Sequence, residues 1–124
     1  MATEATTVSD DCLKRPYSPE GVPWACPPAS VGLSDREVHV WRACLNGHAR
    51  RLPALLAGLS SDEQARAAQY RSWKDRVRFI AAHGFLRKIL GAYAGAAPAQ
   101  LRFRRGLHGK PELCGPCGEV ALRF

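Results

Sequence analysis

Long hydrophobic runs are missing from this 124-residue sequence. No segment approaches the roughly 18 consecutive apolar residues that a membrane-spanning helix requires, and the start of the chain lacks the basic and apolar stretches of a signal peptide. The five cysteines are an odd number without regular spacing, which argues against a secreted fold held by disulfides. We therefore expect a cytoplasmic protein with reduced thiols and no contact with a membrane.

Signatures of the common nucleotide and metal sites are also missing. The sequence has no P-loop and no GxGxxG segment after a strand. No second Cys or His pair stands at zinc-ligand spacing from Cys114 and Cys117. The acidic residues of the second part of the chain form no D-x-E pair among themselves; they are Asp62, Glu63, Asp75, Glu112 and Glu119. From these residues we predict no metal site and no catalytic site.

Acidic residues become scarce after residue 37. Residues 1–37 hold six acidic and three basic side chains, whereas residues 38–124 hold five acidic and fifteen basic ones. Such a positive surplus attracts phosphate groups on nucleic acid, on a nucleotide cofactor or on an anionic membrane surface. A basic nucleic-acid-binding module is therefore one alternative, although aromatic residues are only 8% of the sequence and no stacking or groove-reading motif is present.

Proline divides the sequence into two regions. Residues 1–36 contain five of the nine prolines and show no helical or strand periodicity, so we expect a flexible Pro-rich arm there. Residues 37–124 are expected to form one domain. Its predicted elements are a strand at 37–42, a short helix at 52–57, a helix from a capping box at 60–63 to about residue 70, a long helix at 75–93, a strand at 101–104, a Gly/Pro-rich loop at 106–116 and a strand at 120–124.

This element order predicts an α+β fold. We expect a small, mostly antiparallel sheet with the long helix packed on one face. The last strand ends at Phe124 with no closing segment, so the domain is expected to be truncated there.

Two motifs in the last third of the chain suggest chemistry. The segment Arg105-Gly106-Leu107-His108-Gly109-Lys110-Pro111 places cations on a turn with two glycines, where backbone can approach a phosphate while Arg and Lys bind it. Cys114-Gly115-Pro116-Cys117 reproduces a thioredoxin-type dithiol, but such a dithiol needs its first thiol at a helix N-terminus. A thiol redox protein is therefore the weaker alternative.

Four blocks of sequence resemble a known family. They are DEQARA at 62–67, DRVRFIAAHGFLRKIL at 75–90, LRF at 101–103 and GKPEL at 109–113. In order and spacing, residues 37–124 resemble the N-terminal half of the Sfp-type 4'-phosphopantetheinyl transferases. The resemblance implies one half of a pseudo-dimer that binds coenzyme A. The complete enzyme transfers phosphopantetheine to a serine of an acyl or peptidyl carrier protein, with magnesium on the pyrophosphate.

The resemblance also indicates which residues bind coenzyme A. Arg66, Arg105 and Lys110 match basic family positions that hold its phosphate. The magnesium ligands and the catalytic motif of the family lie beyond the last residue of this sequence. We therefore expect the chain to be inactive alone as a transferase, as a truncated product or the start of a longer enzyme, and to self-associate through its exposed half-interface.

Overall fold

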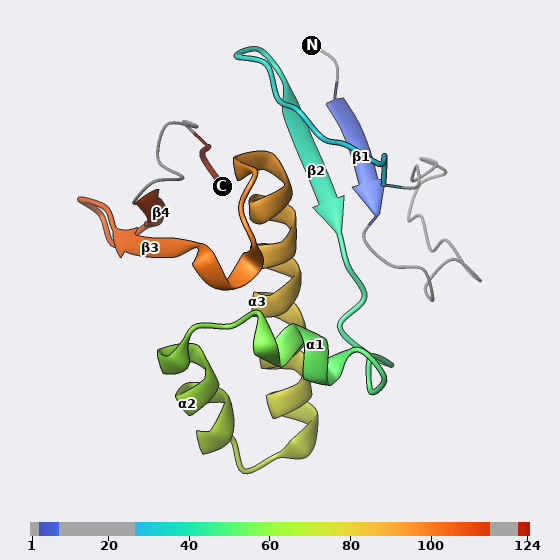
Figure 1. Ribbon diagram of the computed structural model, residues 1–124, viewed down its shortest axis with the longest axis vertical. Helices are drawn as coiled ribbons and strands as arrows, with labels where there is room; N and C mark the ends of the chain where they lie inside the picture. The colour runs from blue at the N-terminus through green and yellow to red at the C-terminus, as the bar shows by residue number, and fades with distance from the viewer. Residues whose placement is uncertain (1–2, 8–26, 115–121) are drawn as a thin grey trace.

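The computed structural model describes residues 3–7, 27–114 and 122–124 of the chain (Figure 1). These residues form three α-helices, one short 3₁₀ helix and two sheets of two strands each. In chain order the elements are β1 (Thr3–Thr7), β2 (Val38–Arg42), α1 (Leu52–Ala57), α2 (Ser61–Gln69), α3 (Trp73–Ala94), η2 (Pro98–Gln100), β3 (Arg102–Arg105) and β4 (Pro111–Cys114). Within the described residues no helix is long and apolar enough to cross a membrane.

The two short helices begin where the sequence predicts. Pro53 lies in the first turn of α1, where its missing N–H costs no hydrogen bond. At the start of α2 the Glu63 N–H donates to the Ser60 hydroxyl over 3.3 Å, and the Ser60 N–H donates to the Glu63 carboxylate over 2.9 Å. This reciprocal pair satisfies two N–H groups that the helix leaves unpaired. The predicted capping box is confirmed.

The long helix α3 is the centre of the molecule. It begins after Ser72, whose hydroxyl accepts the Asp75 N–H, and it ends at Gly95, which adopts a left-handed φ of 66°. Figure 1 shows α1 beside the middle of α3, with β1 and β2 on one side of its C-terminal half and the hairpin β3–β4 on the other. The predicted helix at 75–93 is confirmed, with a slightly longer extent.

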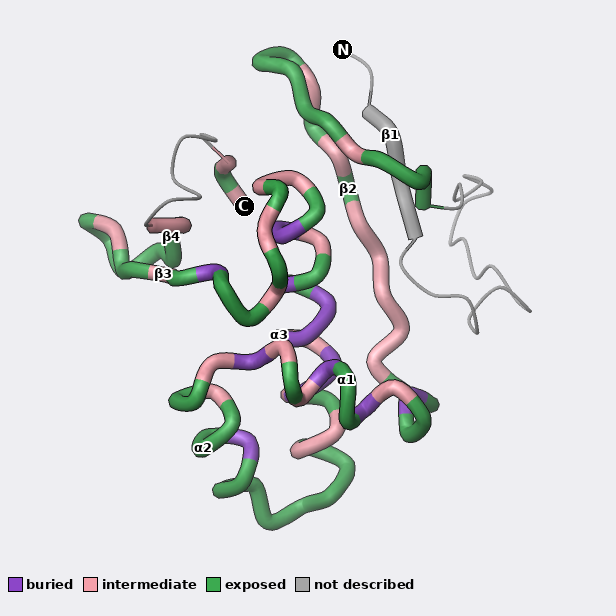
Figure 2. The backbone as a smooth tube through the Cα atoms, in the orientation of Figure 1, coloured by how far each residue is buried: buried purple, intermediate pink, exposed green. Residues whose placement is uncertain are grey.

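The hydrophobic core lies between the three helices. Figure 2 shows the buried backbone positions where α1 and α2 face α3. The core residues are Leu52, Leu55, Leu59, Ala67, Ile80, Ala81 and Phe85. Gly84 allows the close approach of α1 and α3, because a Cβ built there would lie 2.9 Å from two side-chain carbons of Leu55. The core is therefore built mainly by helix-to-helix packing.

The α+β class, the long helix and a small antiparallel sheet are confirmed, but the strands combine differently from the prediction. The 38–42 strand, β2, pairs in parallel with β1, so that Thr3 lies opposite Val38. The antiparallel sheet consists of β3 and β4, with Arg105 opposite Pro111. The structure thus places a strand at residues 3–7, inside the predicted flexible arm, where no strand periodicity was found.

The end of the chain also differs from the prediction. The expected loop at 106–116 is wrong in part, because its residues 111–114 form β4. The described part of the expected strand at 120–124, residues 122–124, has no strand conformation. Residues 120 and 121 lie outside the described residues. Phe124 instead contacts Phe103 of β3 edge to face, with ring centroids 5.9 Å apart.

Candidate functional site: a basic hairpin turn

The turn between β3 and β4 is short and defined by backbone hydrogen bonds. The Gly106 N–H donates to the Lys110 carbonyl over 2.7 Å, and the Gly109 N–H donates to the Gly106 carbonyl over 3.0 Å. Gly109 has a φ of 74°, a left-handed conformation that favours glycine. Leu107 at the tip is 94% exposed. The turn therefore projects into solvent on a fixed backbone.

Arg105 and Lys110 lie at the two ends of this turn. Both side chains are exposed, and within the described part of the chain neither forms an ion pair. The neighbouring Arg104 differs, because its Nε lies 3.3 Å from the Glu112 carboxylate across the hairpin. The Glu112 carboxylate also lies against Gly106, so the exposed backbone of the turn is at residues 107–109. Two cations that flank this exposed backbone form a suitable surface for an anion.

Arg66 lies on another element. It is exposed on α2, with its guanidinium carbon 5.9 Å from the centroid of the Phe79 ring. Phe79 in turn contacts Tyr70 and His83, with ring centroids 5.2 and 4.1 Å apart. The structure thus brings Arg105 and Lys110 together on one hairpin and places Arg66 on a separate helix.

A buried arginine outside the predicted site connects these two elements. Arg87 on α3 is 3% exposed. Its Nε donates to the Glu63 carboxylate over 2.7 Å, and its Nη1 donates to the carbonyls of Pro98 and Leu101 over 2.9 and 2.8 Å. The signal in the sequence was a charged residue within the apolar face of a long helix.

The Arg87 guanidinium also lies against the hairpin itself. Its carbon is 4.9 Å from the centroid of the Phe103 ring in β3, which is within range of a cation–π interaction. Through Glu63 the same side chain holds the first turn of α2. Arg87 therefore fixes the helix that carries Arg66 and the hairpin that carries Arg105 and Lys110 to one point on α3.

The acidic partner responds to this environment. Burial alone would raise the pKa of the Glu63 carboxyl, but hydrogen bonds from Arg87 and from the Ser60 N–H outweigh that effect. The charges of Arg87 and His83 act in the same direction. The net result is a pKa of Glu63 below its ordinary value, so the carboxylate is ionised where it accepts these bonds.

The sequence also contains a possible dithiol, Cys114 and Cys117, and residue types that bind metals. Cys114 is half-buried in β4 rather than at a helix N-terminus, so it does not have the position of the first thiol in a thioredoxin-type dithiol. Cys117 lies outside the described residues. Over residues 3–7, 27–114 and 122–124, no three His, Cys, Asp or Glu side chains come together as a metal site.

The fold and this site define a class of protein: a small α+β module with a basic hairpin turn and an exposed arginine on a neighbouring helix. Comparisons with known proteins make the class specific. The 4'-phosphopantetheinyl transferase HetI of Nostoc sp. is 42% identical over 101 residues, which are 82% of this chain and 43% of that protein. A Synechocystis sp. protein provisionally named as a 4'-phosphopantetheinyl transferase is 40% identical over 62 residues, 50% of this chain and 25% of that protein.

These relatives confirm the resemblance seen in the four sequence blocks: the chain is related to the 4'-phosphopantetheinyl transferases. It spans less than half the length of either relative. No protein-family model matches it, and no solved structure matches it. Neither relative is named as a nucleic-acid-binding or thiol redox protein, so the comparisons do not support those two alternatives.

Proposed function

We propose that this chain is the N-terminal, coenzyme A-binding half of a 4'-phosphopantetheinyl transferase. The observation that carries the proposal is the 42% identity to a transferase of that name over 101 residues. The proposed domain is residues 37–124, preceded by the Pro-rich segment 1–36. The complete enzyme would move phosphopantetheine from coenzyme A to a serine of an acyl or peptidyl carrier protein in the cytoplasm.

In this proposal the basic hairpin binds the 3'-phosphate of coenzyme A. Arg105 offers a planar fork of N–H donors that suits a phosphate, and Lys110 adds a compact positive charge at the other end of the turn. The exposed backbone at Gly109, where even a Cβ would meet no atom within 4 Å, lets a phosphate approach closely. Arg66 on α2 is the third proposed contact, and its helix is fixed relative to the hairpin by Arg87.

The chemical step is proposed to need residues beyond this sequence. In the family, magnesium offsets the charge of the pyrophosphate, and a general base removes the proton of the carrier serine. Neither role is assigned to a residue of this chain. We therefore propose that the chain alone binds coenzyme A without turning it over, and that it self-associates or pairs with a second half-domain.

Titration calorimetry with 3',5'-ADP on the full 124-residue chain tests the binding proposal. Arg105→Gln, Lys110→Gln and Arg66→Gln should each weaken binding by about threefold to tenfold, as expected for the loss of one exposed or partly desolvated charged contact. Arg71→Gln is the matched control, because Arg71 is also exposed and has no proposed role. Equal affinities for the three variants and the parent chain would refute the assignment.

A further inference from the structure

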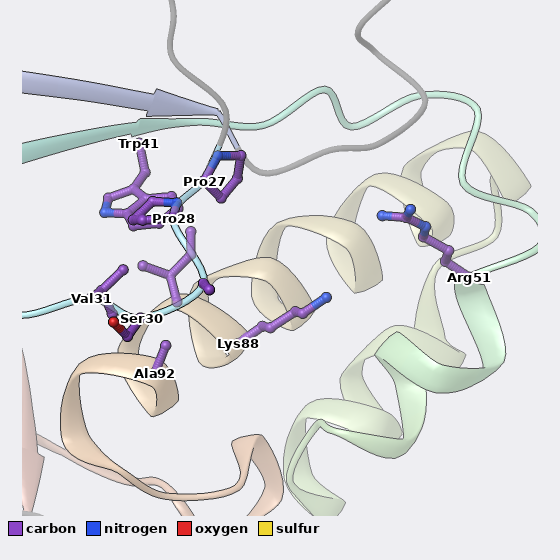
Figure 3. A pocket seen from close by; sticks show the side chains of 10 residues that line it. Pro27, Pro28, Ser30, Val31, Trp41, Arg51, Lys88 and Ala92 are labelled. Carbon is purple, nitrogen blue, oxygen red and sulfur yellow. The ribbon is translucent and has the colours of Figure 1, made fainter.

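A groove that shares no lining residue with the basic hairpin runs along α3. Its first part has a volume of about 470 Å³ and lies between α3, the start of α1 and the segment Pro27–Val31 (Figure 3). A second part of about 660 Å³ continues along α1 and α3 toward Pro98. These volumes are in the range of small-molecule sites.

Two cations occur in both parts of the groove. Lys88 is on α3, and Arg51 is the residue that precedes α1. Figure 3 shows the two side chains pointing toward one another across the opening. The rest of the lining of the first part is mainly apolar, including Trp41, Val31, Ile89 and Ala92. The groove therefore combines a cationic centre with an apolar wall.

Contacts with Tyr93 fix Trp41, the aromatic part of this wall. The Trp41 indole N–H donates to the Tyr93 hydroxyl over 2.8 Å, and the two rings meet edge to face with centroids 6.1 Å apart. The same hydroxyl lies 2.6 Å from Nδ1 of His39. An apolar surface that is already fixed loses little conformational freedom when a ligand binds.

From this geometry we propose that the groove binds an amphipathic organic anion. Its phosphate or carboxylate would lie between Arg51 and Lys88, and its apolar body would lie on Trp41, Ile89 and Ala92. Two converging cations suit an anion better than a neutral group, and the apolar wall gives an organic anion an advantage over inorganic phosphate. This site is separate from the proposed coenzyme A contacts and does not depend on them.

Nuclear magnetic resonance of the labelled full chain tests the proposal with octyl phosphate, kept below its micelle concentration. The readout is the indole N–H signal of Trp41, assigned with Trp41→Phe. We expect octyl phosphate to shift this signal in a saturable way, and octanol to bind at least about tenfold more weakly because it lacks the charge. Equal binding of octanol would show that the cations contribute nothing and would overturn the proposal.

Variants locate the two ends of the ligand. Arg51→Gln with Lys88→Gln should weaken octyl phosphate binding about tenfold, while Arg50→Gln, an exposed neighbour outside the groove lining, should not. Lys88→Gln alone, at an exposed helix position, keeps the test valid if the double variant misfolds. Ala92→Glu places a bulky acid in the groove and should abolish binding.

Two results would contradict the proposal. One is unchanged affinity in Lys88→Gln and Ala92→Glu. The other is that octyl phosphate shifts the backbone signals of Arg105 and Lys110 instead of the Trp41 indole, which would mean that the phosphate binds at the hairpin. Because 3',5'-ADP is expected at the hairpin, failure of one site leaves the other proposal standing.

Discussion

Replacing the buried Arg87 by methionine tests how the molecule is held together. Methionine keeps most of the unbranched apolar stem of arginine but has no charge and no donor. The substitution removes three hydrogen bonds, to the Glu63 carboxylate and to the carbonyls of Pro98 and Leu101. It also leaves Glu63, whose side chain is only 18% exposed, without its closest cation.

The expected cost follows from these contacts. Removing one partner of a buried ion pair destabilises a protein by about 3–5 kcal/mol, since the other charge stays buried and unpaired. Glu63 keeps the Ser60 N–H and some solvent contact, so the lower end, about 3 kcal/mol, is expected. The free energy of unfolding of a small domain is about 5–15 kcal/mol. Arg87→Met should therefore remove a large share of the stability.

Urea unfolding followed by far-ultraviolet circular dichroism measures this loss. Lys88→Met is the matched control, because it removes a cation from the next residue of α3 at an exposed position and should cost less than about 0.5 kcal/mol. Adding Glu63→Gln to Arg87→Met should recover part of the loss, since it removes the unpaired charge. A destabilisation by Arg87→Met of less than about 1 kcal/mol would refute the reasoning.

Two further predictions concern pH and packing. The pKa of Glu63 in the folded state is lowered below its ordinary value of 4.5. The stabilisation by ionised Glu63 is therefore present above that pH and is lost as the pH falls through the folded pKa. Urea midpoints measured from pH 6 down to about 3 should decline less in Arg87→Met than in the parent chain. Gly84→Ala should gain helix propensity but lower the stability overall, by about 1 kcal/mol, because the new methyl would lie 2.9 Å from Leu55 and force α1 away from α3. Gly32→Ala is the control, because a Cβ there would meet no atom within 4 Å, and it should leave the urea midpoint unchanged. A urea midpoint of Gly84→Ala equal to that of the parent chain would contradict the packing argument.

The helices could be predicted from the sequence because their signals are local. The capping box at Ser60 and the apolar pattern of 75–93 depend on residues within a few positions of each other, and the structure shows both features. The strand pairs depend on distant partners. Nothing near residues 38–42 indicates that they pair with residues 3–7, and the Gly/Pro content of 106–116 concealed the short strand β4.

The candidate site divides in the same way. The basic turn from Arg105 to Lys110 could be predicted because both cations and both glycines lie in one short segment. The role of Arg87 could not, since it depends on Glu63, 24 positions earlier, and on Leu101, 14 positions later. A charge count treats Arg87 as one more cation, whereas the folded chain buries it and uses its charge internally.

This burial changes the interpretation of the positive charge. Arg87 forms an ion pair with Glu63, and Arg104 forms one with Glu112. The positive charge of each is therefore balanced within the protein. Arg66, Arg105 and Lys110 remain exposed, on two elements that meet α3 at the same buried arginine. An anion that contacts both elements would therefore depend on Arg87 for the spacing of its contacts. The groove at Lys88 shares no lining residue with these two elements, although Pro98 in its second part accepts a hydrogen bond from Arg87.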